Sequence, residues 1–149
     1  MSTRNRIEVM HGVNLDQLGR RPVVHYGELS YGRLETQIET FAAPLGLRVR
    51  FFQTNAEHEF VEHLHRIHEM SDGIVMNPGA WTHYSYAIRD ALELFEAPIV
   101  EVHLSNPQER EEWRRHSVIA ELAAKRVLGK GPDGYREALE FIVQAVAAA

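Results

Sequence analysis

Short apolar runs alternate with longer amphipathic segments along most of the chain. The runs are rich in Ile, Val and Phe, as β-strands are, and they occupy residues 7–10, 47–52, 73–76, 98–102 and 126–128. In the segments between and after them, hydrophobic residues recur every three or four positions, as on one face of a helix. These segments cover residues 34–45, 60–68, 88–95 and 135–146. The pattern predicts strands that alternate with helices.

This alternation is typical of a parallel sheet whose right-handed crossovers place helices on both of its faces. We therefore predict an α/β fold with three layers, α/β/α, around a five-stranded parallel sheet, and five strands suit a flavodoxin-like order. A length of 149 residues and a hydrophobic content of 44% fit one domain with its own core, which we place at residues 1–149.

Polar residues that can bind ligands follow three of the five predicted strands. They lie in residues 11–27, 77–83 and 103–107, with Arg110 and Arg114 at helical spacing after the last segment. Each segment alone is most simply a turn or a helix cap. In open parallel sheets, however, ligands bind outside the carboxyl ends of the strands. The coincidence of three polar segments at that edge therefore predicts a binding site.

The connection from Gly12 to Gly27 is long for a link between a strand and a helix. Its glycines and the pair Arg20-Arg21 suit a mobile cover that brings positive charge onto an anionic substrate. A solvated surface loop is an equally good interpretation of this segment.

Charge and cysteine content narrow the class of partner. The formal net charge is −5 and the pI is about 6.0, so we expect neither a nucleic acid nor an acidic membrane as partner, and a small molecule is favoured. The absence of cysteine excludes a disulfide framework, a thiol nucleophile and a cysteine-based zinc site. No signal peptide or membrane span is recognisable, so we expect a cytoplasmic protein.

Several motifs lack the context that their chemistry needs. Residues 129–134 match the dinucleotide fingerprint GxGxxG, but no second strand with an acidic residue follows, so we interpret them as a turn. The two lysines, Lys125 and Lys130, lack the apolar setting of a Schiff-base amine, and no serine stands in a nucleophile elbow. Metal binding is disfavoured because no HExxH motif occurs among His58, His63, His65 and His68.

Three blocks of sequence, in order, carry a resemblance to a known family. The first holds GVNL, LGRR and YG at residues 12–15, 18–21 and 26–27. The second holds NPGAWTH and AIRDA at residues 77–83 and 87–91. The third holds EVHLSN, REE and RRHS at residues 101–106, 110–112 and 114–117. On these blocks the chain resembles the type II 3-dehydroquinate dehydratases over nearly its whole length.

The resemblance implies an activity and an assembly. Such an enzyme is a lyase that removes water from 3-dehydroquinate by anti elimination and gives 3-dehydroshikimate, in the shikimate pathway of aromatic amino acid biosynthesis. The reaction passes through an enolate and needs no cofactor and no metal. Members of the family form trimers that assemble into dodecamers, so a homo-oligomer is expected. The resemblance leaves open whether the pathway is biosynthetic or catabolic.

The resemblance also implies catalytic roles for individual residues. Tyr26 matches the base that, as tyrosinate, takes the proton beside the ketone, and Arg21 matches the lid arginine that favours this ionised form. His103, oriented by Glu101, matches the acid that protonates the departing hydroxyl. Asn14 matches the group that helps to hold the enolate.

Further matches concern substrate binding. Asn77 and the backbone amides of Leu104 and Ser105 match the groups that take the substrate carboxylate. The ring hydroxyls would be bound by His83 and Arg114. Arg110 matches an additional arginine of the site. Asp90 matches a residue that the neighbouring subunit contributes.

Elementary chemistry agrees with the implied base and acid. A free tyrosine has a pKa of about 10, so it is a poor base at neutral pH unless cations stabilise its anion. Arg21 and Arg110 could supply such cations. A histidine held by a carboxylate is a sound proton donor near neutrality. In a strand, Glu101-x-His103 places both side chains on one face, because alternate residues point the same way.

Several residues depart from the expected family pattern and leave the substrate open, among them four that stand beside matched positions. His11 stands where Asn is usual and Val13 where Pro is usual, while Trp81 and Tyr84 replace smaller residues, and we expect all four near the pocket rim or a subunit contact. One alternative keeps the chemistry on a related substrate, such as an amino-substituted dehydroquinate. Another is a non-catalytic module that binds a small anion or a protein. The joint presence of the matched base, acid and lid arginine favours catalysis.

Overall fold

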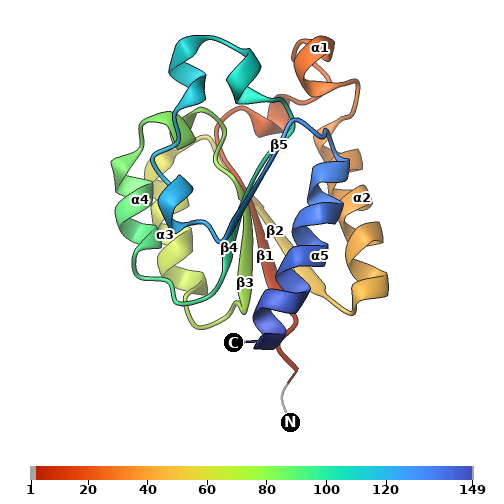
Figure 1. Ribbon diagram of the computed structural model, residues 1–149, viewed down its shortest axis with the longest axis vertical. Helices are drawn as coiled ribbons and strands as arrows, with labels where there is room; N and C mark the ends of the chain where they lie inside the picture. The colour runs from red at the N-terminus through yellow and green to blue at the C-terminus, as the bar shows by residue number, and fades with distance from the viewer. Residues whose placement is uncertain (1–2, 149) are drawn as a thin grey trace.

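The centre of the computed structural model, which describes residues 3–148, is a five-stranded parallel sheet (Figure 1). Its strands are β1 (Arg6–His11), β2 (Arg48–Gln53), β3 (Gly73–Asn77), β4 (Ile99–His103) and β5 (Lys125–Leu128). They lie in the order β2-β1-β3-β4-β5, and all neighbours pair in parallel. This confirms the flavodoxin-like sheet that the alternating pattern predicts.

Helices cover both faces of the sheet. α2 (Tyr31–Ala42) and α5 (Asp133–Ala148) lie on one face, and α3 (Glu57–Ile67) and α4 (Tyr86–Leu92) lie on the other (Figure 1). A short α1 (Val23–Tyr26) stands above the sheet. The connections contain single 3₁₀ turns: η1 (Leu15–Gln17), η2 (Ala43–Leu45), η3 (Gly79–His83), η4 (Pro107–Glu109), η5 (Glu112–Arg115) and η6 (Ala120–Leu122). Within residues 3–148, none of the helices combines the length and apolarity needed to cross a lipid bilayer.

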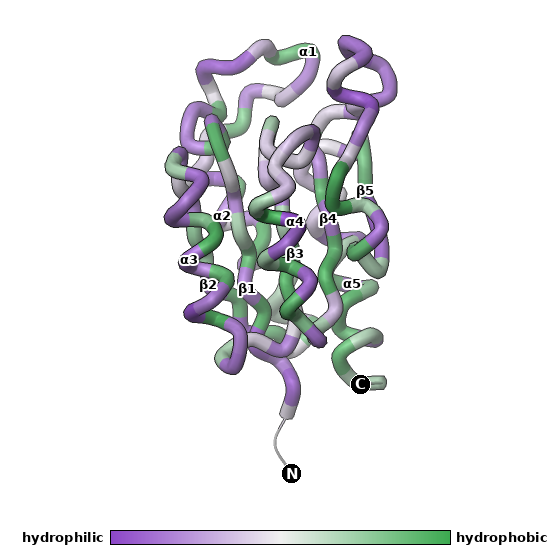
Figure 2. Tube along the Cα trace, turned by 90° about the vertical axis from the view of Figure 1, so that its left-hand side faces the viewer, coloured by the Kyte–Doolittle hydropathy of each residue, from purple (hydrophilic) through white to green (hydrophobic). Residues whose placement is uncertain are grey.

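Two hydrophobic cores form because alternate strand residues point to opposite faces. Val9 and Val75 join the core under α2 and α5, whereas Met10 and Met76 join the core under α3 and α4. Hydrophobic strands at the centre and mostly hydrophilic loops at the top are visible in Figure 2. Buried strands with few charges are typical of parallel sheets covered on both sides.

The long connection after β1 is partly helical. Its first half is anchored by the buried side chains of Leu15 and Leu18, which flank or begin η1. Its second half is α1, where Val23 and Val24 are exposed. The segment is therefore not a structureless surface loop but an anchored turn that carries a short exposed helix.

The loops after β1 and β3 approach closely at the carboxyl edge of the sheet. The amide of Gly12 donates to the carbonyl of Asn77 at 2.8 Å. A Cβ at position 12 would lie 2.1 Å from the carbonyl oxygen of Pro78, so only glycine fits there. This contact brings the polar segments after the two strands to one place.

Candidate active site

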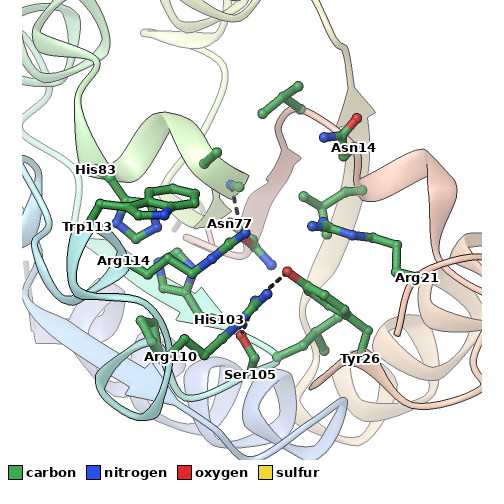
Figure 3. Close-up of a pocket in the computed structure, with 16 residues that line it drawn as sticks. Asn14, Arg21, Tyr26, Asn77, His83, His103, Ser105, Arg110, Trp113 and Arg114 are labelled. Carbon is green, nitrogen blue, oxygen red and sulfur yellow. Dashed lines mark hydrogen bonds between the residues drawn. The ribbon is translucent and has the colours of Figure 1, made fainter. Parts of the chain in front are cut away.

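A cavity of about 180 Å³ opens where the loops after β1, β3 and β4 meet (Figure 3). Three arginines line it and, among the described lining residues, none is acidic. The polar lining residues are Asn14, Arg21, Tyr26, Asn77, His83, His103, Ser105, Arg110 and Arg114. The net charge of the chain is −5, so this concentration of positive charge is local and suits a small anionic ligand.

Tyr26 is the last residue of α1, and its hydroxyl points into the cavity (Figure 3). The helix ends there because Gly27 takes φ 72°, a left-handed value that glycine adopts without strain. Nη1 of Arg110 donates to the Tyr26 hydroxyl at 2.6 Å. The guanidinium carbon of Arg21 lies 4.0 Å from the centre of the ring. A phenolate formed at this position would therefore meet two positive groups at once.

The two arginines beside Tyr26 are not saturated by other partners. Burial lowers the pKa of Arg21, and the positive charges of Arg114 and Arg110 add to this, while attraction to Tyr26 opposes it. Arg110 also donates to Oγ of Ser105 at 3.4 Å, but its buried Nε has no hydrogen-bond partner among residues 3–148. A buried donor without a partner costs free energy, so this atom favours an acceptor on a bound ligand.

His103 and Glu101 form a buried pair on one face of β4. Nε2 of His103 lies 2.6 Å from Oε2 of Glu101, which confirms that the two alternate residues point the same way. Glu101 also accepts from Thr82 at 2.5 Å, from Ser117 at 3.1 Å and from Nε of Arg126 at 2.8 Å. Because Nε2 of His103 is taken by the carboxylate, Nδ1 is the ring nitrogen left for a ligand.

The carboxylate of Glu101 is held in its charged form. Burial alone would raise its pKa, but the hydrogen bond and charge of His103, the Thr82 hydroxyl and the charge of Arg126 outweigh burial and lower the pKa to about 2. Glu101 therefore stays negative at neutral pH and fixes the His103 ring through the hydrogen bond to Nε2.

His83 lies on the other side of the cavity from Tyr26 (Figure 3). Its Nδ1 donates to the carbonyl of His116 at 2.7 Å, which leaves Nε2 as an acceptor in the neutral ring. Burial lowers the pKa of His83, and the positive groups His103 and Arg114 lower it further, although the bond to the carbonyl acts in the opposite direction. A neutral His83 can accept a hydrogen bond from a ligand hydroxyl.

The ends of β3 and β4 supply further polar groups. Asn77, at the end of β3, is buried yet lines the cavity. After β4, the carbonyls of Leu104 and Ser105 accept from the amides of Gly131 and Gly129, both at 3.1 Å. These bonds fix the turn whose backbone amides the family resemblance matches to the groups that bind the substrate carboxylate. Asn14 lines the cavity from a left-handed backbone conformation with φ 69°.

Comparisons with known proteins agree over most of the chain. The profile of the family Dehydroquinase class II matches residues 5–143. The chain belongs to the type II dehydroquinase family. A 3-dehydroquinate dehydratase from Syntrophotalea carbinolica is 49% identical over 131 residues, which cover 87% of this chain and 88% of that protein. Another from Pelobacter propionicus is 47% identical over 135 residues, with 90% and 91% covered. The crystal structure of a type II dehydroquinase from Propionibacterium acnes superposes with a TM-score of 0.90 at 38% identity and covers 97% of this chain and 98% of that one.

Two of the residues matched to dehydroquinase roles do not line the cavity. Glu101 lies behind His103 and reaches the cavity only through it. Asp90 lies exposed on α4, in a shallow depression beside Arg89 and Glu93. Its expected role requires a neighbouring subunit and stays a prediction.

Two expectations about the surroundings of the site were wrong. Arg110 and Arg114 do not share a helix, because Arg110 is extended between the separate turns η4 and η5, although both reach the cavity. Trp81 is not at the pocket rim: it is buried in the core under α3 and α4, with its ring 5.5 Å from that of Phe60. His11 is likewise buried, under the site. Val13 does line the cavity, and Tyr84 is exposed.

Trp113 is a lining residue that the sequence did not single out. Its ring lies 5.2 Å from that of His83, edge to face, and 4.1 Å from the guanidinium carbon of Arg114 (Figure 3). Only its position next to a matched arginine could have suggested it. It walls the cavity beside His83 and holds Arg114 by a cation–π contact.

The other histidine and glycine motifs have structural explanations. Nε2 of His63 lies 2.8 Å from the buried carboxylate of Glu8, and Nε2 of His68 donates to the carbonyl of Leu94 at 3.0 Å. In the part of the chain that the structure describes, no three metal-binding side chains converge. Gly129 and Gly131 have φ 72° and 58° and form the turn into α5, as the sequence predicts.

Proposed function

We propose that this protein is a type II 3-dehydroquinate dehydratase, a hydro-lyase that converts 3-dehydroquinate to 3-dehydroshikimate. The observation that carries the proposal is the pairing of two units in one cavity, Tyr26 with Arg110 and His103 with Glu101. One unit can act as a base and the other as an acid, and a dehydration needs both. The family match over residues 5–143 supports the assignment and a single-domain organisation.

The first step is removal of a proton from the carbon beside the substrate ketone. Tyr26, as tyrosinate, accepts this proton, and the electron pair of the broken C–H bond passes into an enolate. Arg110 stabilises the tyrosinate through its 2.6 Å contact, and Arg21 does so across the face of the ring. Asn14 lines the cavity, and we assign to it the hydrogen bond that holds the enolate oxygen.

The second step is departure of the hydroxyl group. The enolate electrons form the new carbon–carbon double bond as the C–O bond breaks, and His103 transfers a proton to the leaving oxygen from its free Nδ1. Water leaves, and His103 becomes neutral while its remaining proton stays on Nε2, hydrogen-bonded to the Glu101 carboxylate. The anionic Glu101 stabilises the imidazolium before the transfer and fixes the ring. After the reaction Tyr26 has gained one proton and His103 has lost one. Release of a proton from Tyr26 to solvent and uptake of a proton by His103 restore both groups.

The remaining lining groups bind the substrate. The amide of Asn77 and the backbone amides of Leu104 and Ser105 take the carboxylate. His83 and Arg114 take ring hydroxyls, as an acceptor and a donor respectively. The three arginines of the cavity supply the positive field that draws in the anion.

Steady-state kinetics on 3-dehydroquinate test the function directly. The product contains a conjugated enone, so the purified protein should produce a rise in ultraviolet absorbance that saturates with substrate. No rise at any substrate concentration contradicts the proposal. A larger kcat/KM with an amino-substituted dehydroquinate would instead favour the related-substrate alternative. Calorimetric binding of 3-dehydroquinate without turnover would favour a non-catalytic module.

The assembly and location follow from the same family membership. We propose trimers that group into dodecamers in the cytoplasm, with Asp90 offered to the site of a neighbouring subunit. The exposed position of Asp90 and the cysteine-free composition support these assignments. Sedimentation equilibrium tests the assembly, for which a mass of twelve chains of 17.1 kDa is expected. A monomer at micromolar concentration contradicts it.

A further inference from the structure

A buried chain of hydrogen bonds runs beneath the cavity and ends on Asn77. Nδ1 of His11 lies 3.0 Å from the hydroxyl of Tyr31, and its Nε2 lies 2.8 Å from the hydroxyl of Tyr135. Nδ2 of Asn77 donates to the same Tyr135 hydroxyl at 3.4 Å. The side chains come from β1, α2, α5 and β3, and both His11 and Tyr135 are completely buried. None of the catalytic steps above uses this chain.

The donor and acceptor in each of these hydrogen bonds follow from the bond at the Asn77 end of the series. The backbone amide of Gly79 can only donate, and it donates to Oδ1 of Asn77 at 3.1 Å. Nδ2 of Asn77 must therefore face Tyr135, whose oxygen accepts from it. The hydroxyl hydrogen of Tyr135 is then directed at Nε2 of His11.

The state of His11 completes the pattern. Burial lowers the pKa of His11 to about 3, so the ring is neutral and carries one hydrogen. Because Nε2 accepts from Tyr135, the hydrogen sits on Nδ1 and is donated to the hydroxyl of Tyr31. Burial also raises the pKa of Tyr135 and of Tyr31, so both phenols keep their hydrogens. Each of the four hydrogen bonds from Gly79 to Tyr31 then has one donor and one acceptor.

We propose that Tyr135, held by His11, is a positioning residue that fixes the amide of Asn77 with an N–H facing the ligand. Gly79 anchors the amide oxygen and Tyr135 anchors one Nδ2 hydrogen, so the second Nδ2 hydrogen is presented to the cavity. A flipped amide would present its oxygen instead and repel an anion. The fixed orientation of the Asn77 amide therefore favours a ligand with a carboxylate at this position. This deepens the proposed function and rests on it for the identity of the substrate.

A measurement on His11 tests the pattern without any turnover. Nitrogen-15 NMR distinguishes the two neutral tautomers and the charged ring, and the His11 signals are assigned as those missing in the His11→Asn variant. A neutral ring protonated on Nδ1 is expected between pH 5 and 7. A ring protonated on Nε2, or on both nitrogens, overturns the inference even if the enzyme is active.

A pair of tyrosine variants tests the consequence for binding. Tyr135→Phe removes the oxygen that accepts from Asn77, so the KM for 3-dehydroquinate should rise about ten-fold while kcat falls much less. In calorimetry, the affinity for quinate should fall to a similar degree. The affinity for the cyclohexanetetrol that lacks its carboxylate should not change. Tyr86→Phe is the control, because it removes the hydroxyl of an exposed tyrosine on α4 that takes no part in this buried network.

The outcomes separate the inference from the proposed function. Equal losses for quinate and the tetrol, or an unchanged KM in Tyr135→Phe, overturn the positioning role. Absence of turnover in the parent protein would remove the proposed function, while NMR and calorimetry would still decide the inference. If Tyr135→Phe fails to fold, His11→Leu replaces it. That variant removes the ring nitrogen that orients the Tyr135 hydroxyl, and the same selective loss of carboxylate binding is expected.

Discussion

The hydroxyl of Tyr26 lies 2.6 Å from Nη1 of Arg110, although 84 positions separate the two residues in the chain. Tyr26 comes from the short helix after β1, and Arg110 comes from the loop after β4. The base and its counter-charge therefore meet only when both loops are in place over the cavity. The position of the phenol beside its counter-charge therefore depends on the conformation of both loops.

Replacement of Tyr26 by Phe should abolish turnover. The variant keeps the aromatic ring on which Arg21 lies but removes the atom that accepts the substrate proton. We expect kcat to fall by about 10³-fold or more, since a positioned general base contributes roughly 10²–10⁴-fold. The rise in enone absorbance measures it. Quinate affinity, measured by calorimetry, should stay within a few-fold of the parent because the hydroxyl acts in the transition state. Activity close to that of the parent would remove Tyr26 from the mechanism.

The neighbouring arginines at positions 20 and 21 allow a matched comparison. Arg21 lies over the Tyr26 ring, whereas Arg20 is exposed and bonds to Gln17. Arg21→Met should lower kcat/KM by about 10²-fold at pH 7, because the tyrosinate loses a positive neighbour. Loss of a solvent-exposed charge would have a much smaller effect. Arg20→Met should change little. Equal effects in both variants would argue for a general change of surface charge.

The arrangement of the sheet and the identity of most site residues could be predicted from the sequence. Strand and helix periodicity locates all five strands to within one or two residues, because each strand contains a short apolar run. The rule that ligands bind at the carboxyl ends of parallel strands then selects the segments after β1, β3 and β4. The structure places all three around one cavity.

Contacts between distant segments could not be predicted in the same way. The pairing of Glu101 with Arg126 depends on the register of β4 against β5, and the sequence does not state which residues stand opposite each other. The chain from His11 to Asn77 needs the exact docking of α5 on β1 and β3. Trp81 was misplaced because a large aromatic beside a polar motif suits a rim as well as a core.

Arg126 should matter for catalysis although it lies outside the cavity. It stands opposite Glu101 in the β4–β5 register, and its Nε donates to Oε1 of that carboxylate at 2.8 Å. Arg126→Met removes one of the charges that lower the pKa of Glu101, so this pKa should rise from about 2, and the carboxylate that orients His103 becomes less constrained. We expect kcat to fall roughly ten-fold. This is less than the roughly 10²–10⁴-fold that a positioned general acid contributes, because His103 itself is still present.

Two further variants separate this effect from the loss of any surface arginine. Arg126→Lys keeps the positive charge beside Glu101 and should recover part of kcat. Arg136→Met removes an arginine that pairs with Asp133 and Glu140 on the exposed side of α5, and kcat should be unchanged. Steady-state kinetics and urea unfolding give both readouts. If Arg126→Met retains the full kcat, Glu101 needs no counter-charge from β5.

The buried His11 should make the fold sensitive to acid. Its pKa is lowered to about 3 in the folded protein by burial, against an ordinary value of 6.5 when exposed. The unfolded chain therefore binds the proton more readily, so the stabilisation is complete above pH 6.5 and is lost as the pH falls toward 3. Between pH 6 and 4 this one group should lower the free energy of unfolding by about 1.4 kcal/mol per pH unit.

The variant His11→Asn should lack this contribution, since asparagine does not titrate. Urea unfolding at pH 7, 6, 5 and 4 gives the free energy of unfolding of parent and variant as a function of pH. The difference between the two slopes measures the contribution of His11, because the effect of the carboxylates is common to both proteins. His65→Asn is the control, because His65 is exposed on α3 and should leave the slope unchanged. Parallel curves for the parent and His11→Asn would mean that His11 stays accessible to protons in the folded state, and the neutral ring required between Tyr31 and Tyr135 would then be lost as well.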